Sequence, residues 1–253
     1  MKIGIVGEGV VGSAIHRGFK ELGHTVFVHD KKYSTSLFDL KNTEIIFVCV
    51  PTPVGRDNSC DTSAVKTVVN DLMNIGYSGI VAIKSTIIPG TLNTLNFDKS
   101  RLCHVPEFLR EATAYEDFVY RHNVLIIGSP NQKVTDTVIS AHGSLPKETL
   151  ILTPEESEFV KYFSNVFKAY KTVFANSFGK LCSEFNVDYK KILRAYELEG
   201  VKETDYLKFI GPYGGMCLPK DVLALQKLTE ILLPEVSTFN FIHKENEKLL
   251  SSK

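Results

Sequence analysis

The residues best suited to chemistry are a cysteine and two charged side chains beside a glycine-rich turn. Residues 211–221 read GPYGGMCLPKD, so Cys217 follows two glycines and precedes Lys220 and Asp221. Glycine lets the backbone approach a ligand closely, and Pro219 suits the first turn of a helix that begins near Asp221. A positive charge at Lys220 favours the thiolate, the nucleophilic form of cysteine. The segment predicts a sulfur nucleophile; the alternative is a tight turn around a small buried residue.

A second chemical motif lies at the amino terminus. An apolar run over residues 1–6 leads into GEGVVG at 7–12, then a helical stretch over 13–22 and a strand pattern over 25–29 that ends at Asp30. Glycines at this spacing permit the tight turn, the approach of a pyrophosphate and the packing of helix on strand. The helix amino terminus attracts phosphate, and Asp30 would accept hydrogen bonds from ribose hydroxyls and repel a 2′-phosphate. We therefore expect NAD rather than NADP, bound by Gly7, Gly9, Val10, Val11, Gly12 and Asp30.

Four later strand-like runs also end in polar or turn-forming residues. They cover residues 44–50, 79–84, 102–105 and 124–127, and are followed by Pro51-Thr52-Pro53, Ser85-Thr86, Pro106-Glu107 and Gly128, respectively. Ligands of doubly wound sheets bind just beyond the carboxyl ends of the strands. We therefore expect Pro51, Thr52 and Thr86 to contact the cofactor.

A long helix is predicted from a capping box at Thr153–Glu156 through about residue 186. Its apolar stripe is wide and rich in aromatic residues, which is typical of a helix that packs on its own domain and on a partner subunit. Lys161 and Asn165 are four residues apart and so lie on the same side of this helix. By themselves they indicate no more than a solvated polar face.

Composition excludes several classes of protein. The 253 residues carry 29 basic and 29 acidic side chains, so no net charge favours nucleic acid or an anionic membrane. No apolar run is long enough to cross a bilayer. Five cysteines without CxxC spacing suit a reducing cytoplasm and predict no metal site.

Taken together, these segments resemble the UDP-glucose/GDP-mannose dehydrogenase family of NAD-dependent, four-electron nucleotide-sugar dehydrogenases. The matching motifs occur in the family's order and are GEGVVG, CVPTP at 49–53, KSTIIPGT at 84–91, PEFLREATAYEDF at 106–118, the helix with Lys161 and Asn165, and GGMCLPKD at 214–221.

The resemblance implies roles for individual residues. Cys217 would bind the substrate carbon as a thiohemiacetal and then a thioester, while Asp221 and Thr86 position water. Lys161 and Asn165 would hold the oxyanion. Glu107 and Glu111 would lie in the site, Glu111 also at the cofactor and in thioester hydrolysis, and Lys220 would contact substrate or cofactor. The family's long helix forms its dimer interface, so we expect a homodimer that acts on a nucleotide sugar such as UDP-glucose.

The resemblance also implies a third, carboxyl-terminal domain of on the order of 100 residues that grips the nucleotide. No segment of this sequence corresponds to it, so we expect a minimal enzyme, a fragment, or a site completed by a separate chain. Two other functions stay open. One is a non-catalytic NAD-binding module, and the other is a two-domain dehydrogenase of the hydroxyacid kind, for which simple alcohol oxidation needs no thiol.

The expected architecture is α/β. A doubly wound parallel sheet of the Rossmann type would occupy residues 1–150 as the NAD-binding domain. An all-helical central domain with the long helix and the cysteine loop would occupy residues 151–253.

Overall fold

The computed structural model describes residues 1–251 of the chain, which divide into two compact units. The first, called the sheet unit here, contains Met1–Pro53 and Asp61–Lys161. The second, the helical unit, contains Val54–Cys60 and the described residues 162–251. Each unit has its own hydrophobic core.

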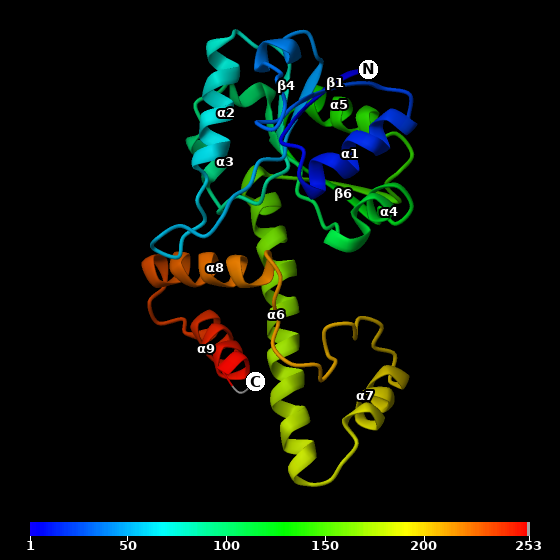
Figure 1. The fold of residues 1–253 in the computed structure, drawn as a ribbon, viewed down its shortest axis with the longest axis vertical. Coiled ribbons are helices and arrows are strands. Elements are labelled where there is room, and N and C mark those ends of the chain that lie inside the picture. Colours follow the sequence, from blue (N-terminus) through cyan, green and yellow to red (C-terminus); the bar gives the residue numbers. More distant parts are fainter. Residues whose placement is uncertain (252–253) are drawn as a thin grey trace. The chain divides into compact units, whose positions relative to one another are not determined.

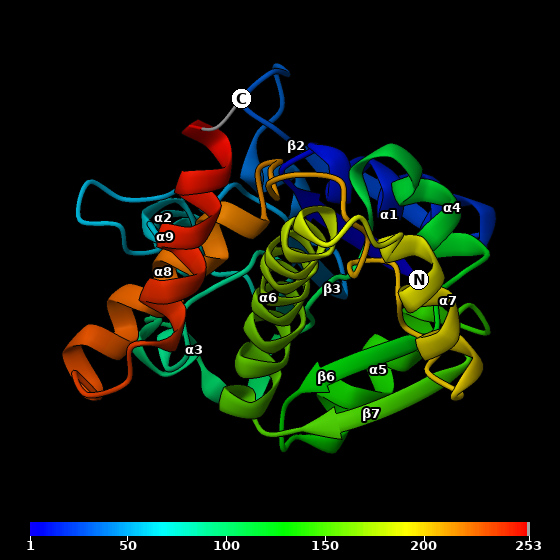
Figure 2. The same ribbon diagram turned by 90° about the horizontal axis from the view of Figure 1, so that it is seen from below.

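The sheet unit is built on seven strands in the order β2-β1-β3-β4-β5-β6-β7. Every pairing is parallel except that of β5 with β6, which is antiparallel. The strands are β1 Lys2–Val6, β2 Thr25–His29, β3 Ile45–Val48, β4 Ile80–Ile83, β5 Leu102–His104, β6 Val124–Gly128 and β7 Glu148–Leu152. The α/β class is confirmed. The edge strand β7 was not expected from the sequence; Figure 2 shows it beside β6.

Helices cover both faces of this sheet (Figure 1). Residues Ile3 and Ile5 of β1 share one core with α1 Val10–Glu21, α4 Ala114–Val119 and α5 Gln132–His142. On the other face Val6 joins a core with α2 Ser63–Asn74 and the short helix α3 Thr91–Thr94. Side chains alternate between the two faces along a strand, and after the exposed Lys2 every residue of β1 is buried, as expected for a parallel strand covered on both faces. Short 3₁₀ turns are η1 Leu37–Leu40, η2 Lys99–Arg101 and η3 Glu111–Thr113.

The order of the strands fixes where a ligand can bind. From β1 the chain crosses to β2 on one side and then returns to β3 on the other side of β1. Such a reversal leaves a crevice beyond the carboxyl ends of the strands, where doubly wound proteins bind their ligands. The glycine loop after β1 and the residues that follow β2, β3 and β4 all lie at this edge.

The long helix α6 Pro154–Glu184 begins in the sheet unit. The predicted capping box is confirmed, since the Thr153 N–H donates to Glu156 over 2.8 Å and the Glu156 N–H donates to Thr153 Oγ1 over 3.2 Å. The buried Glu158 carboxylate accepts hydrogen bonds from the N–H groups of Gly90 and Leu92 over 2.6 and 2.8 Å. These contacts fix the first two turns of α6 on the sheet unit.

The helical unit contains the remainder of α6 together with α7 Tyr189–Leu198, α8 Leu218–Leu232 and α9 Thr238–Ser251. Helices α8 and α9 lie side by side (Figures 1 and 2). Val166, Ala169 and Val173 of α6 form the core of this unit with Val222 of α8 and Ile242 of α9.

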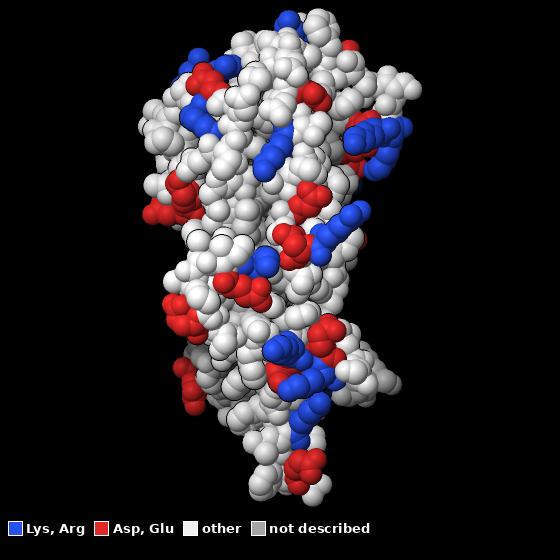
Figure 3. Space-filling model, turned by 90° about the vertical axis from the view of Figure 1, so that its left-hand side faces the viewer, with Lys and Arg blue, Asp and Glu red and all other residues white. Residues whose placement is uncertain are grey.

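The surface carries charges of both signs. On the face seen in Figure 3, Lys and Arg side chains alternate with Asp and Glu. Within residues 1–251, none of the helices has the length and apolarity that a membrane span requires.

Candidate functional site

The glycine loop has the geometry of a dinucleotide cradle. Gly7 has φ +92°, and its N–H donates to the His29 carbonyl over 2.9 Å. A Cβ at Gly12 would lie 1.9 Å from the Gly7 carbonyl oxygen, so only glycine lets α1 pack this closely on the loop. A Cβ at Gly9 would meet nothing within 4 Å, which leaves open space beside the loop for a pyrophosphate. Val10 is the exposed first residue of α1, whereas Val11 packs against the core.

Asp30 follows β2 at the same edge. Its carboxylate accepts hydrogen bonds from the backbone N–H groups of Glu8, over 2.6 Å, and Lys32, over 2.9 Å. These two bonds lower the pKa of Asp30, so it is ionised at neutral pH. An ionised carboxylate here fits the ribose of NAD.

The segments after β3 and β4 are joined by a hydrogen bond. Pro51 is exposed and Thr52 is buried, and the Thr52 hydroxyl donates to the Thr86 carbonyl over 2.8 Å. The structure therefore brings together two residues that the sequence placed in the cofactor site.

A buried ion pair joins the segment that follows β4 to the segment that follows β5. Lys84 Nζ is 2.8 Å from Glu107 Oε1, and the two side chains are 0% and 6% exposed. Lys161 of α6 donates a hydrogen bond to the Glu107 carbonyl oxygen and lies over the Phe108 ring. Glu107 thus links two lysines, one through its carboxylate and one through its backbone. Sequence reasoning gave Lys84 no role, although a lysine directly after the apolar strand β4 was a signal.

Glu111 is exposed at the start of η3. The neighbouring backbone is fixed by Asp117, which accepts hydrogen bonds from the Arg110 N–H over 3.0 Å and the Arg110 guanidinium over 2.7 Å. Hydrogen bonds from Arg110 hold the pKa of Asp117 far below its usual value. Glu111 therefore stands exposed on a turn whose neighbouring backbone is anchored.

In the helical unit Cys217 immediately precedes α8. It is exposed, whereas Cys60, Cys103 and Cys182 are buried and Cys49 is half-buried, and all five lie within the described residues. Helix α8 begins at Leu218, with Pro219 in its first turn. The helix was predicted to begin near Asp221, which is wrong because the Cys217 carbonyl already accepts the first helical hydrogen bond, from the Asp221 N–H over 3.0 Å.

Asp221, one turn into α8, is the centre of a buried polar group. The Asn165 amide of α6 donates to Asp221 Oδ2 over 2.6 Å, and Lys220 Nζ is 2.5 Å from Asp221 Oδ1. Lys220 is therefore paired with its neighbour Asp221. The sequence had predicted that its charge would act on Cys217.

A second lysine, Lys168, is close enough to Cys217 for their charges to interact. Burial and the charge of Lys171 lower the pKa of Lys168 on α6, while Glu203 and Cys217 act in the opposite direction. Lys168 also lies 5.7 Å from the centre of the Tyr206 ring. Sequence reasoning missed Lys168; it lies one turn beyond Asn165, which is the signal that would have identified it.

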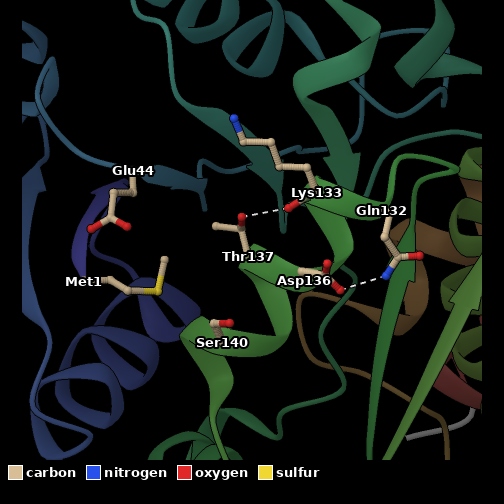
Figure 4. A pocket seen from close by; sticks show the side chains of 7 residues that line it. All are labelled: Met1, Glu44, Gln132, Lys133, Asp136, Thr137 and Ser140. Atoms are coloured by element: carbon tan, nitrogen blue, oxygen red, sulfur yellow. Dashed lines mark hydrogen bonds between the residues drawn. The ribbon is translucent and has the colours of Figure 1, made fainter.

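A surface hollow of about 610 Å³ occurs elsewhere on the sheet unit (Figure 4). It is lined by residues that precede β1 and β3 and by one face of α5: Met1, Glu44, Gln132, Lys133, Asp136, Thr137 and Ser140. Because Met1 and Glu44 stand before their strands, the hollow is at the edge opposite the glycine loop. Within residues 1–251 no group of three or more metal-binding side chains is present.

Comparisons with known proteins agree with this geometry. Residues 32–143 match the NAD binding domain of the UDP-glucose/GDP-mannose dehydrogenase family, and residues 155–248 match its central domain. UDP-glucose 6-dehydrogenase of Rickettsia bellii is 32% identical over 212 residues, which cover 79% of this chain and 49% of that protein. The chain thus spans about half the length of this curated relative.

Solved structures show the same fold. A UDP-glucose dehydrogenase from the hyperthermophilic archaeon Pyrobaculum islandicum superposes with a TM-score of 0.89 at 26% identity, over 98% of this chain and 68% of that chain. The 3-hydroxyisobutyrate dehydrogenase of Mycobacterium tuberculosis superposes with a TM-score of 0.78 over 99% of this chain and 94% of that chain, but at 10% identity it shows the fold alone. The two matching domains, in the family's order and with its NAD-binding domain among them, establish that the chain belongs to the UDP-glucose/GDP-mannose dehydrogenase family.

Proposed function

We propose that the chain oxidises the C6 alcohol of a nucleotide sugar, of the UDP-glucose type, to a carboxylate in two NAD-dependent steps. The observation that carries this proposal is the exposed Cys217, which directly precedes α8 and its buried Asp221–Asn165 pair. Simple alcohol oxidation needs no thiol, whereas oxidation beyond the aldehyde is helped by a covalent intermediate.

NAD, when bound, accepts one hydride in each oxidation. The glycine loop would hold its pyrophosphate and Asp30 its ribose, with further contacts from Pro51, Thr52, Thr86, Glu111 and Lys220. In the first oxidation, a water positioned by Asp221 and Thr86 takes the hydroxyl proton.

Cys217 then adds to the aldehyde carbon, with its thiol proton passing to the oxygen, and forms a thiohemiacetal. Loss of the second hydride and of the hydroxyl proton leaves a thioester. Water, with Glu111 as the base, cleaves the C–S bond, so that the acid leaves and the thiol is restored. Glu107 supports the site through its contacts with Lys84 and Lys161.

Charge on the substrate oxygen would be stabilised by Lys161 and Asn165. Both side chains are hydrogen-bond donors: Lys161 donates to the Glu107 carbonyl oxygen, and the Asn165 amide donates to Asp221 Oδ2. A cation and a neutral donor one helical turn apart can stabilise the oxygen both when it carries a negative charge and when it is neutral.

We propose the domain boundary near residue 150, with NAD binding before it and the central helical domain after it. The matched regions 32–143 and 155–248 support this division. Binding of the nucleotide moiety would require residues beyond the two matched domains or a separate chain.

We further propose a homodimer formed through α6. One stripe of this helix is exposed, apolar and mostly aromatic, and it consists of Phe159, Phe163, Phe167, Tyr170, Phe174, Phe178 and Leu181. Exposed apolar stripes of this size mark contacts with another chain.

The test measures how many molecules of NADH are formed for each molecule of sugar oxidised. Purified chain is mixed with NAD and a panel of UDP- and GDP-sugars, and NADH is followed by its absorbance. We expect two NADH per sugar, loss of turnover in Cys217→Ser, and retained turnover in the matched variant Cys49→Ser. One NADH per substrate that survives Cys217→Ser would favour a hydroxyacid-type dehydrogenase instead. Binding of NADH with no turnover on any sugar, even with a co-purified partner, would favour a non-catalytic NAD-binding module.

A further inference from the structure

Glu8, the residue between the first two glycines of the loop, carries an acidic side chain that the loop itself does not require. Its carboxylate accepts a hydrogen bond from the Tyr33 hydroxyl over 2.5 Å and lies 2.5 Å from His16 Nδ1. Its backbone N–H donates to Asp30 Oδ2 over 2.6 Å. Glu8 thus contacts both α1 and the segment that follows β2.

Two negative charges therefore meet at this corner of the site. Burial acts to raise the pKa of Glu8, but hydrogen bonds from Tyr33 and His16 outweigh it and the pKa is lowered overall. The Asp30 charge opposes the ionisation of Glu8, so the two carboxylates are close enough to interact. At neutral pH both groups are ionised.

Basic side chains also surround this corner. Lys32 Nζ donates to the Glu8 carbonyl oxygen over 3.1 Å, and Lys32 attracts the Asp30 carboxylate. His29 interacts with Asp30 and lies 3.2 Å from the Thr35 hydroxyl. A phosphate on the adenosine ribose would therefore meet two carboxylates and at least one lysine, and the balance of these charges decides whether it is accepted.

We propose that Glu8 is a second specificity-determining residue, beside Asp30, that makes the site prefer NAD over NADP. The inference rests on the proposed NAD-dependent function. Asp30 is the acidic group proposed to contact the ribose, and the Glu8 backbone N–H donates to it. The Glu8 carboxylate bonds Tyr33, three residues beyond Asp30, so a further negative charge lies at the same corner. Exclusion of NADP is then a property of the pair, because selectivity is a difference between two binding free energies and each repulsive charge adds to it.

A purely structural role would give a different result. Tyr33 and His16 could use the Glu8 carboxylate only to tie the segment after β2 to α1. Loss of such a tie would weaken both dinucleotides equally. Loss of a repulsive charge would strengthen NADPH binding alone.

The experiment is titration of the purified chain with NADH and with NADPH, followed by nucleotide fluorescence. In Glu8→Gln the preference for NADH over NADPH should fall about tenfold, as expected for one charge removed near a phosphate at intermediate dielectric. Tyr33→Phe, which removes the tie but no charge, should change both affinities by the same factor. Glu148→Gln, at the exposed start of β7, should change neither. A thermal melt of each variant confirms folding.

The outcomes separate this inference from the proposed function. An unchanged NADH-to-NADPH ratio in folded Glu8→Gln overturns the inference and leaves the dehydrogenase proposal intact. A shifted ratio in a chain that oxidises no sugar sustains the inference and counts against the dehydrogenase proposal. A folded wild-type chain that binds neither dinucleotide overturns both.

Discussion

The amide of Asn165 donates a hydrogen bond to the Asp221 carboxylate over 2.6 Å, between α6 and α8, with both residues buried. Replacement of Asn165 by leucine would leave a buried carboxylate with one donor fewer. We expect the free energy of unfolding of Asn165→Leu to fall by about 1–3 kcal/mol, measured by chemical denaturation. Asn93 provides the control, since it is exposed and donates to the half-buried Glu155, and Asn93→Leu should cost less. Equal costs for the two variants would contradict the importance of burial.

Disruption of the buried Lys84–Glu107 pair should cost more stability than the loss of the Asn165 bond. Lys84→Met leaves the Glu107 charge buried without its partner and should destabilise the sheet unit by about 3–5 kcal/mol. The double variant Lys84→Met/Glu107→Gln should recover part of this loss, because no buried charge is left unpaired. The exposed pair Lys208–Asp205 serves as control, and Lys208→Met should cost less than about 1 kcal/mol. A double variant no more stable than Lys84→Met would disprove the explanation.

The carboxyl group of Glu158 predicts a specific pH dependence. Burial raises the pKa of Glu158 from 4.5 to about 7. The folded chain therefore holds a proton that the unfolded chain releases, so this group stabilises the fold below pH 4.5 and its contribution is lost as the pH rises towards 7. The difference in unfolding free energy between wild type and Glu158→Gln should change by up to about 3 kcal/mol over this interval. If the unfolding free energies of the two proteins changed in parallel with pH, the raised pKa of Glu158 would be refuted as the cause.

Lys168 predicts a charge effect on the reactivity of Cys217. If Lys168 is the cation that faces the sulfur, anionic iodoacetate should react with Cys217 faster, relative to neutral iodoacetamide, in the wild type than in Lys168→Met. Lys220→Met should have a smaller effect, because Asp221 already pairs with Lys220. The measurement is the ratio of the two alkylation rates by mass spectrometry. A ratio that depends on Lys220 and not on Lys168 would restore the expectation from the sequence.

The aromatic stripe of α6 predicts an assembly. Phe163 is 73% exposed, and Phe163→Glu should shift a dimer towards monomer in light scattering without lowering the thermal stability of the monomer. Phe38, 61% exposed on η1, is the matched control, and Phe38→Glu should leave the mass unchanged. A wild-type chain that is monomeric at all concentrations tested would remove the basis of this prediction.

The sequence predicted those parts of the fold that depend on local pattern. The glycine spacing and the run to Asp30 predicted β1, α1 and β2, and Thr25–His29 is the observed strand. The edge strand β7 could not be predicted in the same way, because its residues are largely exposed and form no buried apolar run.

In the candidate site, sequence reasoning found residue types and missed contacts. The motif around Cys217 indicated an accessible thiol, but only three-dimensional packing shows that Lys220 is paired with Asp221 and that Lys168 lies near enough to interact with the charge of the cysteine. Likewise the buried partner of Glu107 is Lys84, 23 residues earlier in the chain. Long-range pairing of charges depends on which strands and helices are neighbours, and no local pattern encodes it.

The boundary between the two compact units falls inside α6, after Lys161. Helix α6 carries Lys161 in its last turn on the sheet side and Asn165 one turn later, and one helical turn separates them by about 6 Å along the axis. A chain divided at this boundary would have an interrupted α6, and its first half would end in two helical turns without the rest of the helix. Two halves expressed separately should therefore both include all of α6, Pro154–Glu184, so that each half contains the complete helix.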